Sequence, residues 1–237
     1  MKNKIYNILK LLICLVFFFS ISNITSFILK IFNINKDSIS TYYVVLYQFI
    51  VSFIMFVLLF VLYYKTFKKD YKSFKKNISK NITYIIKTFI IFIIVKYLIG
   101  VISSLVMILC GFELDNIVSN NQEMIMEYVK SAPILMAFSM SILGPFYEEG
   151  IFRLGFRKVF NNKWAYIIIS GSLFGLLHVF PLSDGVTLSL GIIQSISYVT
   201  MGMFFSYIYY KTDNIFNSIG LHFLNNILSV LAIISML

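Results

Sequence analysis

The hydrophobic positions of this chain form long apolar runs that are separated by short polar segments. About seven of these runs approach or exceed the roughly 20 residues that an α-helix needs to cross a bilayer. They lie approximately at residues 8–34, 41–64, 82–110, 131–160, 164–181, 187–210 and 214–236. The pattern therefore predicts an all-α fold, a polytopic transmembrane helix bundle of about seven spans.

The composition of the 237 residues agrees with a location in the lipid bilayer. Hydrophobic residues make up 59% of the chain and charged residues 13%, which is far from the usual composition of a soluble domain. No internal repeat and no Pro-, Gly- or Ser-rich linker divides the chain. We interpret it as one continuous membrane domain, with N-terminal scaffold helices at 1–125 and a catalytic core at 126–237.

The positive charge is concentrated between the apolar runs. The net charge is +10, and the segment 65–80 alone holds seven lysines. Because lysine-rich loops stay on the cytoplasmic side, we expect a multi-pass protein of the cell membrane whose N-terminus is cytoplasmic. The lysines form no soluble basic face with stacking aromatics, so no nucleic acid partner is expected.

The first apolar run, at residues 8–34, lacks a small-residue cleavage site, which favours a retained membrane anchor over a signal peptide.

The segment between the third and fourth runs is acidic instead. It carries Glu113, Asp115, Glu123 and Glu127. The stretch 123–129, EMIMEYV, is amphipathic when it is drawn as a helix. We therefore expect a short helix that lies on the outer membrane surface.

Several ionisable side chains interrupt the apolar runs in the second half of the chain. They are the pair Glu148–Glu149, Arg153 and the only two histidines, His178 and His222. An ionisable side chain in the bilayer centre costs about 2.5–3.5 kcal/mol even on the mild insertion scale. Several such sites in one chain indicate an active centre.

The two neighbouring glutamates are expected to have different roles. On a helix, Glu148 and Glu149 point about 100° apart, so we expect that they do not face one partner. Arg153 follows Glu149 by four residues, the spacing of an ion pair on one helical face. This pairing would leave Glu148 free to accept a proton. Pro145, just before the pair, predicts a kink in the fourth run.

The histidines can reach the depth of Glu148. Glu148 and His178 lie at similar distances from the predicted turn at 161–163, and Asn226 follows His222 by one helical turn. A glutamate beside a neutral imidazole can deprotonate a water molecule, while a second imidazole and a carboxamide donate hydrogen bonds to an oxyanion. This set of groups can hydrolyse an amide without a serine or cysteine nucleophile.

Other unusual residues in the runs have simpler interpretations. Lys87 can extend its amine to the nearer membrane surface, whereas Lys96 lies deeper and the sequence gives it no role. Asn225 is expected to make a structural hydrogen bond between helices. Cys14 and Cys110 are expected to be buried as small apolar side chains.

Three motifs carry a family resemblance. The segments 148–153 (EEGIFR), 174–178 (FGLLH) and 222–226 (HFLNN) match EExxxR, FxxxH and HxxxN. The chain thereby resembles the CPBP family of intramembrane proteases, which includes CAAX prenyl endopeptidases and bacterial proteins linked with bacteriocin production and self-immunity. The resemblance implies that the active site lies within the membrane and opens to the cytoplasm.

The resemblance also implies roles for single residues. In the family's terms, Glu148 and His178 activate water, and His222 with Asn226 stabilises the oxyanion. We expect Glu149 and Arg153 to support the site, and the Phe174 ring to help fix the His178 imidazole. The implied activity is that of a glutamate-dependent endopeptidase that cleaves a peptide or a membrane-associated protein.

Other interpretations of the same residues remain open. Two histidines and a glutamate could bind zinc, but HExxH is absent and Asn226 is a poor zinc ligand, so we expect no metal and no other cofactor. A non-proteolytic protein for bacteriocin self-immunity or scaffolding is the alternative from another class, and a proton-coupled transporter is a third.

The lysine- and isoleucine-rich composition is typical of an AT-rich bacterial genome. In such a host we expect a bacteriocin-like or signalling peptide as substrate, rather than a prenylated protein.

Overall fold

The structure, a computed structural model, describes residues 2–31, 39–112, 119–182 and 186–236. Glu113 and Asp115 of the acidic segment lie outside these ranges. All regular elements within them are helices, so the predicted all-α fold is confirmed. In chain order they are α1 (Lys2–Ile31), α2 (Thr41–Lys76), α3 (Ile78–Leu109), α4 (Asn120–Ser131), α5 (Pro133–Phe138), η3 (Ser139–Leu143), α6 (Gly144–Glu148), η4 (Glu149–Gly155), α7 (Phe156–Val159), α8 (Lys163–Leu176), α9 (Leu188–Thr212) and α10 (Ile215–Ile234).

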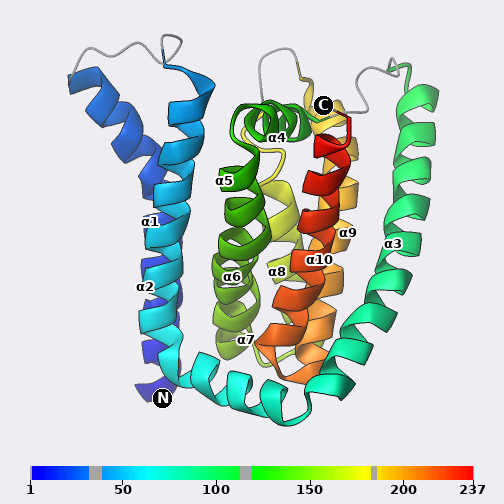
Figure 1. The fold of residues 1–237 in the computed structure, drawn as a ribbon. Coiled ribbons are helices and arrows are strands. Elements are labelled where there is room, and N and C mark those ends of the chain that lie inside the picture. The colour runs from blue at the N-terminus through cyan, green and yellow to red at the C-terminus, as the bar shows by residue number, and fades with distance from the viewer. Residues whose placement is uncertain (1, 32–38, 113–118, 183–185, 237) are drawn as a thin grey trace.

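The helices form an upright bundle (Figure 1). Four of them, α2, α3, α9 and α10, are long and apolar enough to cross a membrane. The other upright segments are α1, the succession from α5 to α7, and the shorter α8. Each segment falls on one of the predicted apolar runs, so the polytopic bundle is confirmed.

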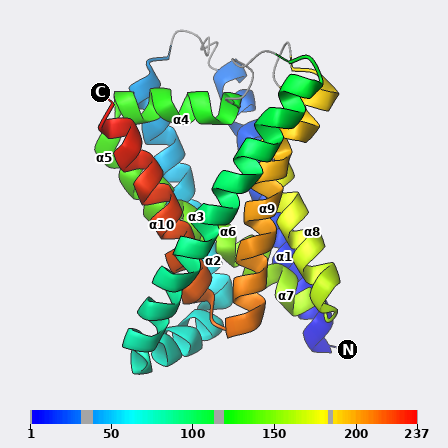
Figure 2. The ribbon, with the colours of Figure 1, turned by 90° about the vertical axis from the view of Figure 1, so that its right-hand side faces the viewer.

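The two ends of the bundle differ in charge and in the helix that lies across each of them. The α2 backbone departs from helical geometry at Tyr63, and its lysine-bearing last part runs across the end at which the N-terminus lies. We call this the lysine-rich end. The amphipathic helix α4 lies across the opposite end, near the C-terminus (Figure 2). We call that the α4 end, and α4 confirms the short helix expected from EMIMEYV.

The fourth span is not a regular α-helix. It contains two π-helical segments, η3 and η4, on either side of α6. The Gly144 N–H donates to the Ser139 carbonyl, five residues back, and Pro145 has no N–H to offer. We predicted a kink at Pro145, and the structure shows widened helical turns on either side of α6. Glu148 and Glu149 lie where α6 joins η4.

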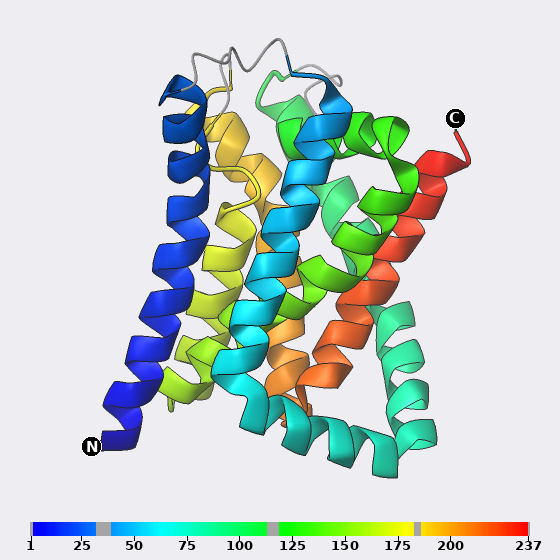
Figure 3. The same ribbon diagram turned by 60° about the vertical axis from the view of Figure 1, so that its left-hand side comes forward.

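Helix α1 runs along one side of the bundle (Figure 3). Its Leu11 and Cys14 are buried in one apolar cluster with Ile151 and Phe152 of η4. A Cβ atom on Gly155 would lie only 2.9 Å from Leu11 Cδ1, so the glycine permits this close approach. α1 therefore packs against the back of the segment that carries the glutamates.

Helices α8 and α9 approach each other closely along glycines. Gly171 and Gly175 of α8 form a GxxxG pair, and a Cβ on Gly175 would lie 2.3 Å from the Val199 backbone nitrogen. A Cβ on Gly202 of α9 would lie 2.4 Å from the Gly171 carbonyl oxygen. Such small residues allow helix backbones to pack in a membrane. The contact fixes the end of α8, where His178 follows.

The lysine-rich end of α2 holds the start of α10. Asp70 is buried, and its carboxylate accepts a hydrogen bond from the Ile215 N–H at 3.2 Å. The Asn214 side chain donates to the Asp70 carbonyl at 2.9 Å. Free N–H groups at a helix start need such acceptors. Asp70 thereby anchors the helix that carries His222.

Replacing Gly175 with alanine should test the α8–α9 packing. We expect Gly175→Ala to lower the free energy of unfolding by about 1–3 kcal/mol, because the added methyl group meets backbone. Gly100→Ala in α3 is the matched control, since no atom lies within 4 Å of its Cβ position. Thermal unfolding in detergent micelles would measure both. Equal melting temperatures for the two variants would contradict the close packing.

Candidate active site

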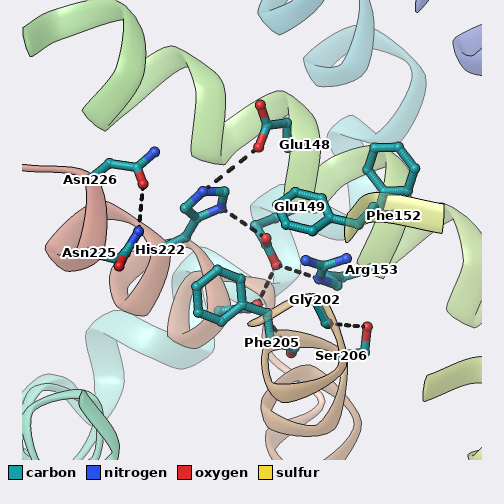
Figure 4. Close-up of polar contacts among 12 residues, drawn as sticks. Glu148, Glu149, Phe152, Arg153, Gly202, Phe205, Ser206, His222, Asn225 and Asn226 are labelled. Atoms are coloured by element: carbon teal, nitrogen blue, oxygen red, sulfur yellow. Dashed lines mark hydrogen bonds and ion pairs between the residues drawn. The ribbon is translucent and has the colours of Figure 1, made fainter. Parts of the chain in front are cut away.

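A buried ion pair lies at the centre of the polar cluster. Arg153 Nε lies 3.1 Å from Glu149 Oε2, and both side chains are inaccessible to solvent (Figure 4). The Arg153 guanidinium also lies over the Phe174 ring, 4.5 Å from its centroid. The Ser218 hydroxyl donates to Glu149 Oε2. The predicted pairing of Glu149 with Arg153 is therefore confirmed.

His222 lies between the two glutamates (Figure 4). Its Nδ1 lies 3.0 Å from Glu149 Oε1, and its Nε2 lies 3.7 Å from Glu148 Oε2. The expectation that the two carboxylates do not face one partner was wrong. An imidazole has nitrogens on two edges, so two carboxylates that diverge on the fourth span can each reach one of them.

The two glutamates differ in access. The Glu148 side chain is 19% exposed and lines a cavity, whereas Glu149 is fully buried beside Arg153. A carboxylate that takes part in water chemistry must be reachable by water. Glu148 is thus the accessible carboxylate and Glu149 the buried one, and their roles as reacting and supporting groups stay predictions.

His178 lies just beyond α8 and not within a helix. The apolar run predicted a span to residue 181, but α8 ends at Leu176 and a turn follows. His178 Nδ1 lies 2.8 Å from the Phe174 carbonyl oxygen. A carbonyl can only accept, so Nδ1 carries the proton and Nε2 of the neutral ring remains an acceptor.

Two aromatic rings hold the His178 imidazole. The Phe174 ring lies 4.6 Å from it, as its spacing predicts, and the Tyr198 ring stacks on it at 5.0 Å with planes 19° apart. The Tyr198 hydroxyl is in turn 2.9 Å from Ser119 Oγ, at the start of α4. His178 is therefore fixed from both α8 and α9.

A chain of side-chain hydrogen bonds surrounds Asn226. Lys96 donates to Asn225 Oδ1 at 2.9 Å, which confirms Asn225 in a bond between helices. Asn225 Nδ2 donates to Asn226 Oδ1 at 2.9 Å. Asn226 Nδ2 donates to the Met140 carbonyl at 2.7 Å and carries a second hydrogen. The carboxamide is thus oriented by its neighbours.

All four candidate catalytic side chains line one cavity of about 590 Å³. They are Glu148, His178, His222 and Asn226. They come from three parts of the chain: Glu148 from α6, His178 from the turn after α8, and His222 and Asn226 from α10. The structure thereby brings together the residues that the three motifs indicated.

The cavity lies on the α4 side of the glutamates. Besides the candidate residues, it is lined by side chains at and near α4, among them Ser119, Gln122 and Tyr128. Because α8 has only 14 residues, it leaves room beyond its end, which α4 covers. We expected both a cytoplasmic lysine-rich end and a site open to the cytoplasm. These two expectations conflict, since the cavity extends to the opposite end.

Three residues of the site had weak or no signals in the sequence. Ser218 precedes His222 by four residues and so shares its helical face, a pattern that could have been recognised. Lys96 is conspicuous as a charge within an apolar run. Tyr198 had no signal, because its contact with His178 depends only on how α8 packs against α9.

The described residues contain no group of three or more His, Cys, Asp or Glu side chains that could hold a metal ion. His222 contacts Glu148 and Glu149, and the second of these is already paired with Arg153. Metal-free chemistry at this site stays a prediction.

Part of the second half of the chain is similar to a known protein family. Residues 130–228 match the family model described as type II CAAX prenyl endopeptidase, Rce1-like. This match confirms the resemblance carried by the three motifs, and it supports an enzyme of the protease type. No curated protein and no solved structure gives a significant match.

Removing one member of the buried ion pair should be costly. We expect Arg153→Gln to lower the free energy of unfolding by about 3–5 kcal/mol, because Glu149 is left buried and unpaired. Glu149→Gln combined with Arg153→Gln should recover part of that loss. Arg157→Gln, on the half-buried α7, is the control. Chemical unfolding in detergent measures all three, and a double variant no better than Arg153→Gln would contradict the coupling.

Cys110 offers a direct test of which side of the membrane the α4 end faces. It follows α3 and is exposed, contrary to our expectation of burial, whereas Cys14 is buried as expected. If the lysine-rich end is cytoplasmic, a membrane-impermeant maleimide should label Cys110 in intact cells. Cys110→Ser should abolish the labelling. Labelling only after permeabilisation would place the α4 end, and with it the cavity, on the cytoplasmic side.

Proposed function

We propose, from the premise that residues 130–228 are of the Rce1-like endopeptidase type, that the protein is a glutamate-dependent intramembrane endopeptidase. Its substrate is a peptide or a membrane-associated protein. The observation that supports this is the division between the glutamates: Glu148 opens onto the same cavity as His178, while Glu149 is buried with Arg153. One carboxylate is thus accessible and the other structural.

In the proposed reaction, Glu148 acts as general base. A water molecule in the cavity donates one hydrogen bond to Glu148 and one to Nε2 of His178, which is an acceptor because Nδ1 donates to Phe174. As the water oxygen attacks the scissile carbonyl carbon, its proton passes to Glu148. The same proton then passes to the leaving amine nitrogen when the C–N bond breaks, which restores the carboxylate.

His222 and Asn226 are proposed to stabilise the tetrahedral oxyanion. Glu149 holds Nδ1 of His222, so Nε2 is the nitrogen on the Glu148 side. Nδ1 donates to Glu149, so Nε2 donates to a negative oxygen beside Glu148 when the ring is an imidazolium, in which both nitrogens carry a hydrogen. The second hydrogen of Asn226 Nδ2 supplies another donor. Preorganised donors of this kind typically contribute about 10²–10³ in rate each.

The cavity favours a peptide as the bound group. Its lining mixes apolar surface with hydroxyl and carboxamide groups, including Ser52, Ser139, Gln194 and Asn121. Such groups can bind the N–H and C=O groups of an extended backbone, which an apolar cleft alone would leave unsatisfied. We propose a bacteriocin-like or signalling peptide as the natural substrate.

Glu148→Gln should abolish cleavage and leave the fold intact. The amide has the size of the carboxylate but accepts no proton, so we expect a rate loss of about 10²–10⁴. The measurement is comparative peptidomics of membranes and medium from cells that express wild type or Glu148→Gln at equal levels. The melting temperature in detergent should stay near that of wild type, because Glu148 is partly exposed. Full cleavage by Glu148→Gln would contradict the mechanism.

Two controls separate the competing interpretations. Cleavage should persist after treatment with a chelator, and activity that is lost and then restored by zinc would indicate a metal enzyme. If cells with Glu148→Gln and His178→Ala remain fully protected from a cognate bacteriocin, binding rather than catalysis carries the biological function.

A further inference from the structure

The last part of α2 runs across the end of the bundle instead of along it. Beyond Tyr63, where the backbone departs from helical geometry, residues 64–76 turn sideways at the lysine-rich end (Figure 1, Figure 3). The apolar part of α2 leads into this segment, and the span α3 begins at Ile78, directly after it. Because spans hold both of its ends, the segment stays at the membrane surface. We call residues 64–76 the in-plane segment.

One face of the in-plane segment packs against the bundle. Phe67 and Asp70 are buried and Phe74 is half-buried, and their spacing of three and four residues places them on one side of a helix. The rings of Phe67 and Phe74 lie 6.4 and 6.0 Å from the ring of Phe216, near the start of α10. This face is therefore used within the protein, and the opposite face is exposed.

The exposed face carries positive charge without acidic partners. Asp70 is the single acidic residue of the in-plane segment, and it lies on the buried face, where it accepts the N–H at the start of α10. Four exposed lysines recur on the other face at helical spacing, and in the described part of the chain none of them joins an ion pair. They are Lys68, Lys72, Lys75 and Lys76, and with Tyr71 they line an open hollow of about 540 Å³.

The position of this face indicates which anion it meets. Like charges three and four residues apart on a helix repel each other, so an anion between them is stabilising. At the membrane surface the abundant anions are phospholipid phosphates, and lysine clusters directly beside a membrane span attract anionic lipids. The exposed Tyr64 and Tyr71 accompany the lysines, and tyrosine rings are favoured at the level of lipid headgroups. The chemistry of the face thus fits an anionic phospholipid.

We propose that the exposed face of the in-plane segment binds the headgroups of anionic phospholipids. The lysine ammonium groups donate charge-assisted hydrogen bonds to the phosphate oxygens. The bound lipid holds the in-plane segment in place, and with it the contacts of Asp70 and Phe74 that attach the start of α10 on the opposite face. Anionic lipid therefore stabilises the folded protein. This inference does not depend on the proposed function.

Lipid binding to the full chain in nonionic detergent micelles tests the proposal. The probes are phosphatidylglycerol and phosphatidylcholine with identical acyl chains. Native mass spectrometry measures the bound lipid, and thermal unfolding measures its stabilising effect. We expect phosphatidylglycerol to bind more tightly and to raise the melting temperature more. Each lysine near anionic lipid contributes about a factor of five, so a variant with Lys72→Gln, Lys75→Gln and Lys76→Gln should bind phosphatidylglycerol about a hundredfold more weakly.

Two further variants separate a local site from net charge. Replacing the same three lysines with arginine keeps the charge and should keep the lipid preference. A matched control removes three lysines outside the in-plane segment, and it should also keep the preference. Without added lipid, the three-glutamine variant of the segment should melt near wild type, because its lysines are exposed. The control substitutions are Lys4→Gln, Lys163→Gln and Lys211→Gln.

Several outcomes would overturn the assignment. Equal binding of the two lipids to wild type would remove it, and so would a phosphatidylglycerol preference that survives the loss of the three segment lysines. An equal loss in the matched control would reduce the effect to net charge. Inorganic phosphate and glycerol phosphate are the last probes. If either raises the melting temperature as much as phosphatidylglycerol does, the hollow binds a soluble anion and not a lipid.

Discussion

The buried ion pair of Glu149 and Arg153 is the interaction on which the rest of the site depends. Glu149 holds His222 of α10 through Nδ1 and accepts from Ser218 of the same helix. Arg153 lies against Phe174 of α8 and Phe205 of α9. A buried ion pair offsets the cost of desolvating its two charges only when surrounding groups hold both side chains in good geometry. The pair therefore ties the fourth span to three other helices at the depth of the reacting groups.

Close packing between other helices shapes the cavity beside the Glu149–Arg153 ion pair. The glycine contacts between α8 and α9 hold the end of α8 against α9, and α8 stops early, so His178 lies in a turn at the edge of the cavity. Asp70 anchors the start of α10 and thereby sets the height of His222. The resulting cavity is reached by Glu148 but not by Glu149. Access to the cavity, and not residue type, therefore distinguishes Glu148 from Glu149.

The cavity has charged groups of opposite sign along its wall. Glu148 lies at the cluster of histidines, and Lys96 lies where this cavity meets an adjoining one of about 360 Å³. In the proposed reaction Glu148 activates water, while Lys96 donates a hydrogen bond to Asn225 beside Asn226. Its extension toward the α4 end makes the orientation of the protein in the membrane central to where the substrate comes from.

The sequence by itself determined the features that depend on local spacing. Long apolar runs predicted the helices, and the four-residue interval from Glu149 to Arg153 predicted their ion pair, because neighbours on one helical face meet whatever the rest of the chain does. Only the tertiary structure decided that His222 lies between both glutamates, that His178 follows a helix end, and that Lys96 meets Asn225 across two helices. These contacts depend on which helices pack together and at what height, and no local spacing encodes that.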